Sequence, residues 1–154
     1  IGKIDTRKNQ FLYQGIDSID FVGPIGNSFN FDTNKNYLGE WTRKKIYDSI
    51  TEYANMFLLS VGENGTPLVI KEALMSGLGI VTSEYCAYEL DKNLPFIHII
   101  PTDKLNDLDY VNNILLENRE VSLSMRESIV EYGVNNFSWQ KLIKIYSENI
   151  KLLK

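Results

Sequence analysis

Residues 60–83 read SVGENGTPLVIKEALMSGLGIVTS and combine a strand end, a glycine-containing loop, a short helix and a second strand. Thr66 and Pro67 are typical of an N-cap and a first helical position, and Gly77 is typical of a helix stop. In a parallel sheet this order places a helix N-terminus at the carboxyl ends of the strands. Open α/β folds bind phosphorylated ligands there.

The same alternation of strands and helices continues on both sides of this segment. Short apolar or alternating runs predict strands, and apolar residues at helical spacing predict helices. The expected strands are 19–22, 56–59, 79–82 and 96–100, and the expected helices are 9–15, 42–54, 66–76, 105–118 and 122–135. We therefore expect one Rossmann-like, doubly wound α/β domain over residues 1–154, with a parallel sheet, helices on both faces and a helical C-terminal end.

The last expected helix starts at Ser138, and its apolar stripe is expected to pack into the core. This stripe comprises Trp139, Leu142, Ile143, Tyr146, Ile150 and Leu153.

Composition excludes several classes of protein. The 154 residues carry a net charge of −4, which argues against nucleic acid as a partner, because such proteins normally present a basic face. No apolar run reaches the roughly 20 residues of a membrane span, so we expect no transmembrane segment. The single cysteine, Cys86, and the lack of a signal-peptide pattern predict a cytoplasmic location. Because the chain begins Ile1-Gly2 rather than with Met, we expect it to be a piece of a longer protein.

Two sets of residues have the chemistry to bind a small anion. Lys3, Arg7 and Lys8 follow an expected strand end, where cations can neutralise phosphate oxygens. The alternative, which the segment taken alone favours, is a charged surface turn. Glu72 lies on the second turn of the helix after Pro67, where it could accept hydrogen bonds from ribose hydroxyls. The alternative is a routine strand–helix turn with a solvated glutamate.

Four collinear segments resemble the C-terminal, nucleotide-sugar-binding half of a retaining GT-B glycosyltransferase of the family 4 type. They are Gly2-Lys3-Ile4 with Lys8-Asn9, Phe21-Val22-Gly23, the run from Asn64 through Glu72-Ala73 and Gly77 to Ser83, and Phe137-Ser138-Trp139.

The resemblance implies a donor site for a nucleoside-diphosphate sugar. Lys3 and Lys8 would bind the diphosphate, assisted by Arg7, and Glu72 would bind the ribose. Lys3, Lys8 and Glu72 are the implied catalytic residues. The implied donor-binding residues are Lys3, Arg7, Lys8, Gly23, Glu63, Asn64, Gly65, Pro67, Leu68, Val69 and Glu72. No metal and no cofactor besides the donor substrate is implied. The acceptor would bind a missing N-terminal domain, so this part alone is expected to bind the donor but to transfer sugar poorly or not at all.

Two residues depart from the family pattern. Asn64 stands where the first of two glutamates is usual, with Glu63 one residue early, and Lys3 stands where arginine is usual. These departures keep two alternatives open. One is a non-catalytic nucleotide-binding or interaction domain with the same fold, and the other is half of a sugar-nucleotide epimerase. We expect the only histidine, His98, to occupy a core or edge position, and Cys86 to be an ordinary small side chain.

Overall fold

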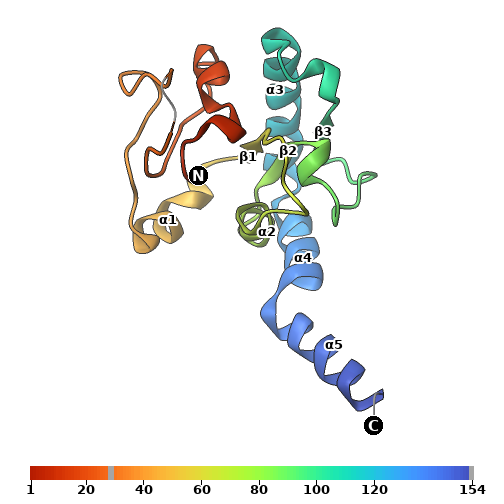
Figure 1. Ribbon diagram of the computed structural model, residues 1–154. Coiled ribbons are helices and arrows are strands. Elements are labelled where there is room, and N and C mark those ends of the chain that lie inside the picture. Colours follow the sequence, from red (N-terminus) through yellow and green to blue (C-terminus); the bar gives the residue numbers. More distant parts are fainter. Residues whose placement is uncertain (28–29, 153–154) are drawn as a thin grey trace.

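The computed structural model describes residues 1–27 and 30–152. The chain has an α/β fold built on a parallel sheet of three strands in the order β1-β2-β3 (Figure 1). The strands are β1 (Asn55–Leu58), β2 (Gly79–Ser83) and β3 (Ile97–Ile100). Every residue of the central β2 is buried, as expected for a parallel strand with both faces covered. Three of the four predicted strands, 56–59, 79–82 and 96–100, are therefore confirmed to within one residue at each end.

A helix occurs at each predicted position, but the one expected at 9–15 is a 3-10 helix and the one expected at 105–118 covers 108–124. The α-helices are α1 (Arg43–Ser49), α2 (Leu68–Met75), α3 (Leu108–Ser124), α4 (Arg126–Phe137) and α5 (Trp139–Leu152). The 3-10 helices are η1 (Thr6–Lys8), η2 (Gln10–Gly15), η3 (Ile50–Glu52), η4 (Glu84–Cys86) and η5 (Thr102–Lys104). Over the described residues, no helix combines the length and apolar character that crossing a membrane requires.

Successive residues of β2 point into two different cores. Ile80 packs with Ile70 of α2 and Ile129 of α4 on one face of the sheet. Val81 packs on the opposite face with Val111 of α3 and with Tyr13 of η2. The predicted arrangement of helices on both faces is thus confirmed, and the N-terminal region shares the core on the α3 side.

Close backbone packing joins α2 to α4. A Cβ atom added at Gly133 would lie 2.6 Å from the Leu74 carbonyl carbon, so only glycine allows this approach. At the end of α2, Gly77 has a φ of +80°, which confirms its predicted role as the helix stop.

In the N-terminal region, residues 2–4, 21–25 and 36–38 run side by side in parallel, but they do not form regular strands. Gly2 N donates to Val22 O at 2.8 Å, and Leu38 N donates to Phe21 O at 2.9 Å. The predicted strand at 19–22 is therefore wrong in extent, because only Phe21 forms a bridge, to Tyr37. Gly23, which has a φ of +140°, follows directly and interrupts the extended backbone.

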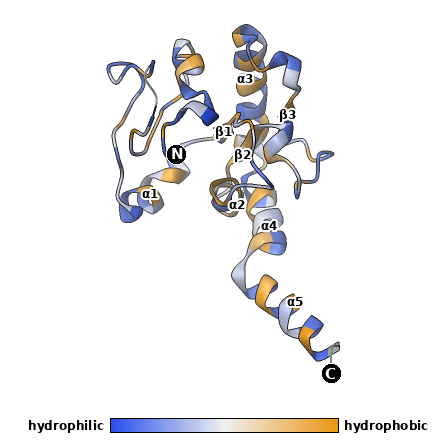
Figure 2. Ribbon diagram, viewed as in Figure 1, coloured by the Kyte–Doolittle hydropathy of each residue, from blue (hydrophilic) through white to orange (hydrophobic). Residues whose placement is uncertain are grey.

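The last helix does not pack as predicted. Trp139 is 73% exposed and Tyr146 is 69% exposed, and Leu142, Ile143 and Ile150 are exposed as well. Leu153 lies outside the described residues. Ser138 has an extended backbone that redirects the chain after α4, so α5 leads away from the sheet (Figure 1). Apolar and polar residues alternate along this exposed helix (Figure 2).

Candidate functional site

One backbone hydrogen bond joins the segment of Lys3, Arg7 and Lys8 to the loop between β1 and α2. Val61 N, in the loop after β1, donates to Arg7 O at 3.2 Å. This bond places η1 beside the segment that leads to α2. Residues distant in sequence, those around Lys8 and those around Gly62, therefore approach the same part of the molecule.

The geometry of η1 depends on Asp5. Its carboxylate accepts from Lys8 N at 3.2 Å and lies 3.9 Å from the Arg7 guanidinium. The Lys8 ammonium turns back over the backbone, because a Cβ atom at Gly2 would lie only 3.2 Å from Nζ. Lys8 therefore contributes a positive charge beside the first residues of the chain, whereas Arg7 is partly neutralised by Asp5.

Lys3 and Gly23 lie in two adjacent, parallel segments of the N-terminal region, because Gly2 N donates to Val22 O and Ile4 N donates to Pro24 O. The exposed Lys3 side chain passes across Gly26, where an added Cβ atom would lie 2.3 Å from its Cε. Gly23 is buried, and an added Cβ atom there would lie 2.1 Å from Gly2 O. Gly23 O also accepts from the Tyr37 hydroxyl at 2.9 Å. The structure thus gives Gly23 a packing role against Gly2.

The start of α2 differs in detail from the prediction. Pro67 is the N-cap and α2 begins at Leu68, because the Thr66 hydroxyl accepts from Glu89 N at 3.0 Å instead of capping the helix. Leu68 is 71% exposed. The hydrogen bonds of the described residues leave the amides of Leu68 and Val69 without acceptors. These two N–H groups can therefore receive an anion from solvent.

In the loop before α2, Glu63 and Asn64 face different surroundings. The Glu63 carboxylate accepts from the Ser60 hydroxyl at 3.0 Å, which turns it back toward the end of β1. Asn64 is exposed, and Gly65 has a φ of +127° with no atom within 4 Å of an added Cβ. In this loop conformation the exposed amide of Asn64, rather than the Glu63 carboxylate, is presented to solvent.

Glu72 is exposed on the second turn of α2. Its side chain forms no hydrogen bond or ion pair among the described residues. The neighbouring Lys71 pairs with Glu89 instead, at 2.5 Å. Glu72 is thus free to accept hydrogen bonds from a ligand.

Cys86 lies beneath this loop, fully buried. Its sulfur is 3.6 Å from the Ser83 hydroxyl, which itself donates to Ser60 O at 2.6 Å. Burial is the main cause that raises the pKa of the Cys86 thiol, and the charge of Glu63 is a minor one. The thiol stays protonated at neutral pH, which fits the expected ordinary side chain and gives no nucleophile.

His98 is half-buried on β3 and does not join the other candidate residues. Its Nδ1 lies 3.0 Å from the side-chain nitrogen of the buried Asn118, which also donates to Phe96 O at 3.0 Å. This position agrees with the prediction of a core or edge histidine. No group of three or more His, Cys, Asp and Glu side chains that could hold a metal occurs among the described residues.

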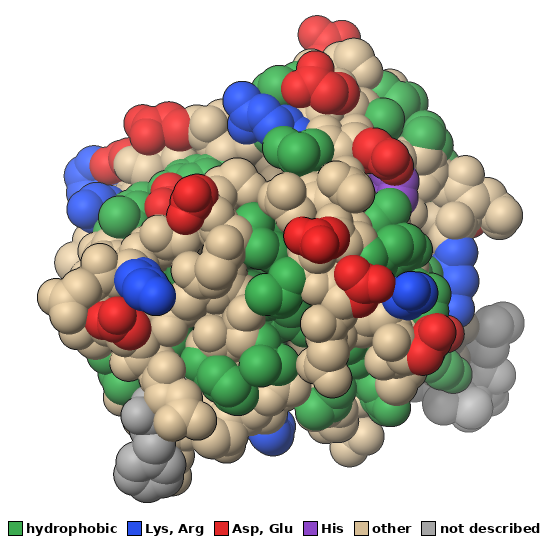
Figure 3. Space-filling view, turned by 90° about the horizontal axis from the view of Figure 1, so that it is seen from above, with side chains coloured by type: hydrophobic (Ala, Val, Ile, Leu, Met, Phe, Trp, Pro, Cys, Tyr) green, Lys and Arg blue, Asp and Glu red, His purple; other side chains and the backbone are tan. Residues whose placement is uncertain are grey.

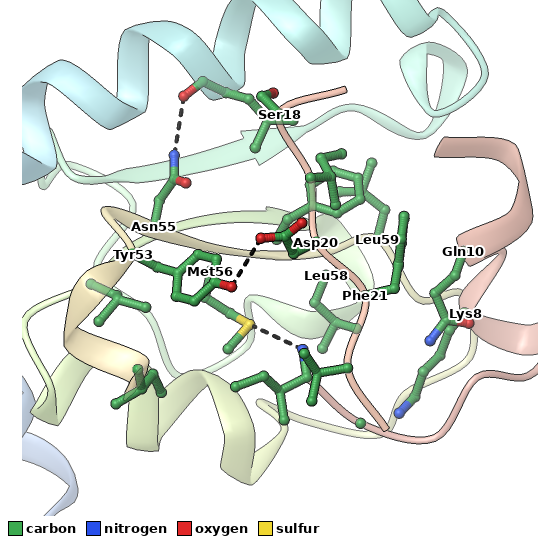
Figure 4. A pocket seen from close by; sticks show the side chains of 18 of the residues that line it. Lys8, Gln10, Ser18, Asp20, Phe21, Tyr53, Asn55, Met56, Leu58 and Leu59 are labelled. Carbon is green, nitrogen blue, oxygen red and sulfur yellow. Dashed lines mark hydrogen bonds between the residues drawn. The ribbon is translucent and has the colours of Figure 1, made fainter. Parts of the chain in front are cut away.

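A cavity of about 360 Å³ lies between the N-terminal region and β1. Lys8 and Gln10 line one part of it, and Asp20, Tyr53 and Asn55 line another (Figure 4). Among the predicted site residues that the structure describes, only Lys8 lines this cavity. Sequence reasoning missed it, because its walls depend on which backbone segments pair and which do not.

On the face shown in Figure 3, surface charge does not mark out a binding site. Acidic and basic side chains are interspersed among apolar ones on the face shown in Figure 3. No protein-family model matches the chain, and no curated protein matches its sequence.

Proposed function

We propose that the chain is the donor-binding domain of a retaining GT-B glycosyltransferase, which transfers a sugar from a nucleoside-diphosphate sugar to an acceptor. The observation that carries the proposal is the hydrogen bond from Val61 N to Arg7 O. It brings the Lys8 region to the loop that leads to the free amides of Leu68 and Val69. A diphosphate placed there would meet cations on one side and helix N–H groups on the other.

The chain topology supports a Rossmann-like, doubly wound arrangement. Residues 36–39, 21–23 and 2–4 lie side by side in parallel, and β1, β2 and β3 form a parallel sheet of their own. In the proposed domain the two sets are neighbours through residues 2–4 and β1, which would give the order 3-2-1-4-5-6 of dinucleotide-binding folds. In such folds ligands bind beyond the carboxyl ends of the strands, where the proposed site lies.

In the proposed reaction the protein stabilises the departing diphosphate. Lys3 and Lys8 provide positive charge, and the Leu68 and Val69 amides provide fixed donors for the oxygen that gains charge as the sugar leaves. Glu72, free of protein partners, accepts hydrogen bonds from the ribose hydroxyls. The acceptor would come from a further domain, and the whole would act in the cytoplasm. No metal is needed in this scheme, since cations of the chain take that role.

A non-catalytic nucleotide-binding domain is the second candidate, and the Glu63 geometry favours it. The Glu63 carboxylate accepts a hydrogen bond from Ser60 rather than facing solvent, and Asn64 takes the exposed position. A transferase requires Glu63 to leave Ser60 when the donor sugar arrives. A domain that only binds nucleotide leaves this bond intact.

Thermal unfolding in the presence of UDP, GDP, ADP and their sugar conjugates tests the proposal. One of these nucleotides should stabilise the chain, by about 2.7 kcal/mol at a hundredfold excess over its dissociation constant. Failure of all of them at millimolar concentration would overturn both candidates. The E63Q variant separates the two. E63Q should weaken binding of the sugar conjugate, relative to binding of the bare nucleotide, only if the Glu63 carboxylate contacts the donor sugar. The matched control is E120Q on α3.

A further inference from the structure

The loop that leads to α2 contains an asparagine followed directly by a glycine, Asn64-Gly65. Asn64 is exposed and lies outside any helix or strand. The side-chain hydrogen bond of this loop joins Ser60 to Glu63 and involves neither Asn64 nor Gly65. Among the hydrogen bonds of the described residues, none has the Gly65 nitrogen as its donor. The side-chain amide of Asn64 and the backbone nitrogen that follows it are therefore both free to move.

The backbone around Gly65 is open on the side where other residues carry a side chain. Its φ is +127°, and no atom lies within 4 Å of an added Cβ. Gly62, at the other end of the loop, has a φ of +89° and the same open surroundings. Two glycines with free space around them let the backbone between them rotate with little steric resistance. The Gly65 nitrogen can therefore approach the side-chain carbonyl carbon of Asn64.

Other exposed asparagines of the chain are held in turns that block this approach. The Asn34 side chain donates to the Asp32 carboxylate at 3.1 Å, and the backbone nitrogen of Lys35 donates to Asp32 O at 3.2 Å. The Asn93 side chain donates to the Asp91 carboxylate at 3.0 Å, and the amide after Asn93 donates to Asp91 O at 3.3 Å. At these two positions both the side chain and the next backbone nitrogen are already engaged.

We propose that Asn64 is a site of spontaneous deamidation, in which Gly65 supplies the attacking nitrogen and which the folded loop leaves open. The Gly65 N–H gives its proton to a solvent base, and the nitrogen forms a bond to Cγ of Asn64. The side-chain nitrogen takes up a proton and leaves as ammonia, which closes a succinimide ring. Water then opens the ring. Breaking the bond from nitrogen to Cγ gives aspartate, and breaking the bond from nitrogen to the backbone carbonyl carbon gives isoaspartate.

The reaction changes both the charge and the backbone of the loop. Either product has a carboxylate in place of a neutral amide, so the chain gains one negative charge beyond its formal net charge of −4. Isoaspartate also lengthens the backbone by one methylene group, which the glycines at both ends of the loop can accommodate. The modified chain should therefore stay folded. The new charge enters the loop that leads to the free amides of Leu68 and Val69.

Peptide mass spectrometry of the purified chain, kept in a mildly alkaline buffer made with heavy-oxygen water, tests the proposal. Position 64 should take up heavy oxygen and yield both aspartate and isoaspartate, as the ring intermediate requires. Conversion should be at least about tenfold faster than at Asn34 and Asn93, which are controls within the same sample. Asn64→Gln should abolish the change at this position on the same time scale, because glutamine would have to close a larger and less favourable ring.

A second incubation in urea measures what the fold does to each asparagine. The rate at Asn64 should stay close to its native value, whereas Asn34 and Asn93 should react faster once their hydrogen bonds are lost. Aspartate without isoaspartate at position 64 would overturn the proposal, because direct hydrolysis needs no attack by Gly65. Equal native rates at the three asparagines, or a rate at Asn64 far lower in the native chain than in urea, would overturn it as well.

Discussion

The Arg7 carbonyl oxygen accepts a hydrogen bond from the Val61 amide at 3.2 Å, and this bond fastens η1 to the loop after β1. Among the hydrogen bonds of the described residues, it is the direct backbone link between the two halves of the proposed donor site. The cations of η1 and the free amides of α2 consequently depend on one local geometry. Changes that displace the first residues of the chain should therefore affect both stability and ligand binding.

Replacing Gly23 by Ala should destabilise the chain by about 2 to 4 kcal/mol, because φ is +140° and the new Cβ would lie 2.1 Å from Gly2 O. Gly39→Ala is the matched control, since Gly39 also has a positive φ but has no atom within 4 Å of an added Cβ. It should cost only the backbone strain, about 1 kcal/mol. Urea unfolding measures both, and equal losses would show that the contact with Gly2 is unimportant.

Truncating one isoleucine in the core and one on α5 tests the unexpected position of the last helix. Ile129→Ala should lower the free energy of unfolding by about 2 to 5 kcal/mol, because Ile129 on α4 is fully buried in the core that α4 shares with α2. Ile143→Ala should change the free energy of unfolding by less than about 0.5 kcal/mol, because this side chain is 62% exposed. A large loss at Ile143 would mean that its side chain is covered in solution.

Stability should fall in acid through the cap of α3. The Asp107 carboxylate accepts from Tyr110 N and from the Lys104 ammonium, each at 3.1 Å, and these bonds hold its pKa below the ordinary value of 3.8. A lowered folded-state pKa contributes stability above the unfolded value, and that stability is lost as the pH falls through the folded value.

The Asp107→Asn variant isolates this carboxylate. Asparagine can still cap the helix but cannot lose or gain the charge. The wild-type chain should have the higher unfolding midpoint near neutral pH, and the difference should shrink as the pH falls below 3.8. Thermal unfolding across the acid range measures it. A difference that stays constant with pH would contradict the assignment.

Local signals in the sequence predicted the regular elements well. The Thr42 hydroxyl accepts from Lys45 N at 3.2 Å, as a cap should, and Gly77 ends α2. Both features depend on residues within one or two turns, so spacing alone identifies them. The apolar runs of β1 to β3 were equally clear, because strands buried on both faces need continuous apolar residues.

Features that depend on distant partners could not be predicted. The apolar stripe of α5 has the same spacing as a core helix, and its exposure depends on how Ser138 turns the chain. The position of Glu63 depends on a hydrogen bond to Ser60, which spacing from Glu72 does not reveal. The cavity is lined by residues from segments far apart in the sequence, and side-chain patterns carry little information about which segments lie next to one another.

Removing the carboxylate charge of Glu72 should weaken nucleotide binding without changing stability. Glu72→Gln should lower the affinity for the stabilising nucleotide about tenfold, the effect of losing roughly 1.4 kcal/mol from hydrogen bonds to a charged acceptor. Glu120→Gln, at an exposed position on α3, should bind normally. Calorimetric titration measures both variants. Equal affinities would remove Glu72 from the ribose site while leaving the diphosphate site untouched.

The location of a bound nucleoside diphosphate distinguishes the proposed donor site from every other surface of the chain. Titration of the isotope-labelled chain with UDP, GDP or ADP reports on every backbone amide. We expect the largest chemical-shift changes at the amides of Leu68 and Val69, in the loop from Gly62 to Gly65, and in residues 3–8. Saturating changes confined to another part of the molecule, or no changes with any of the three nucleotides, would contradict this expectation.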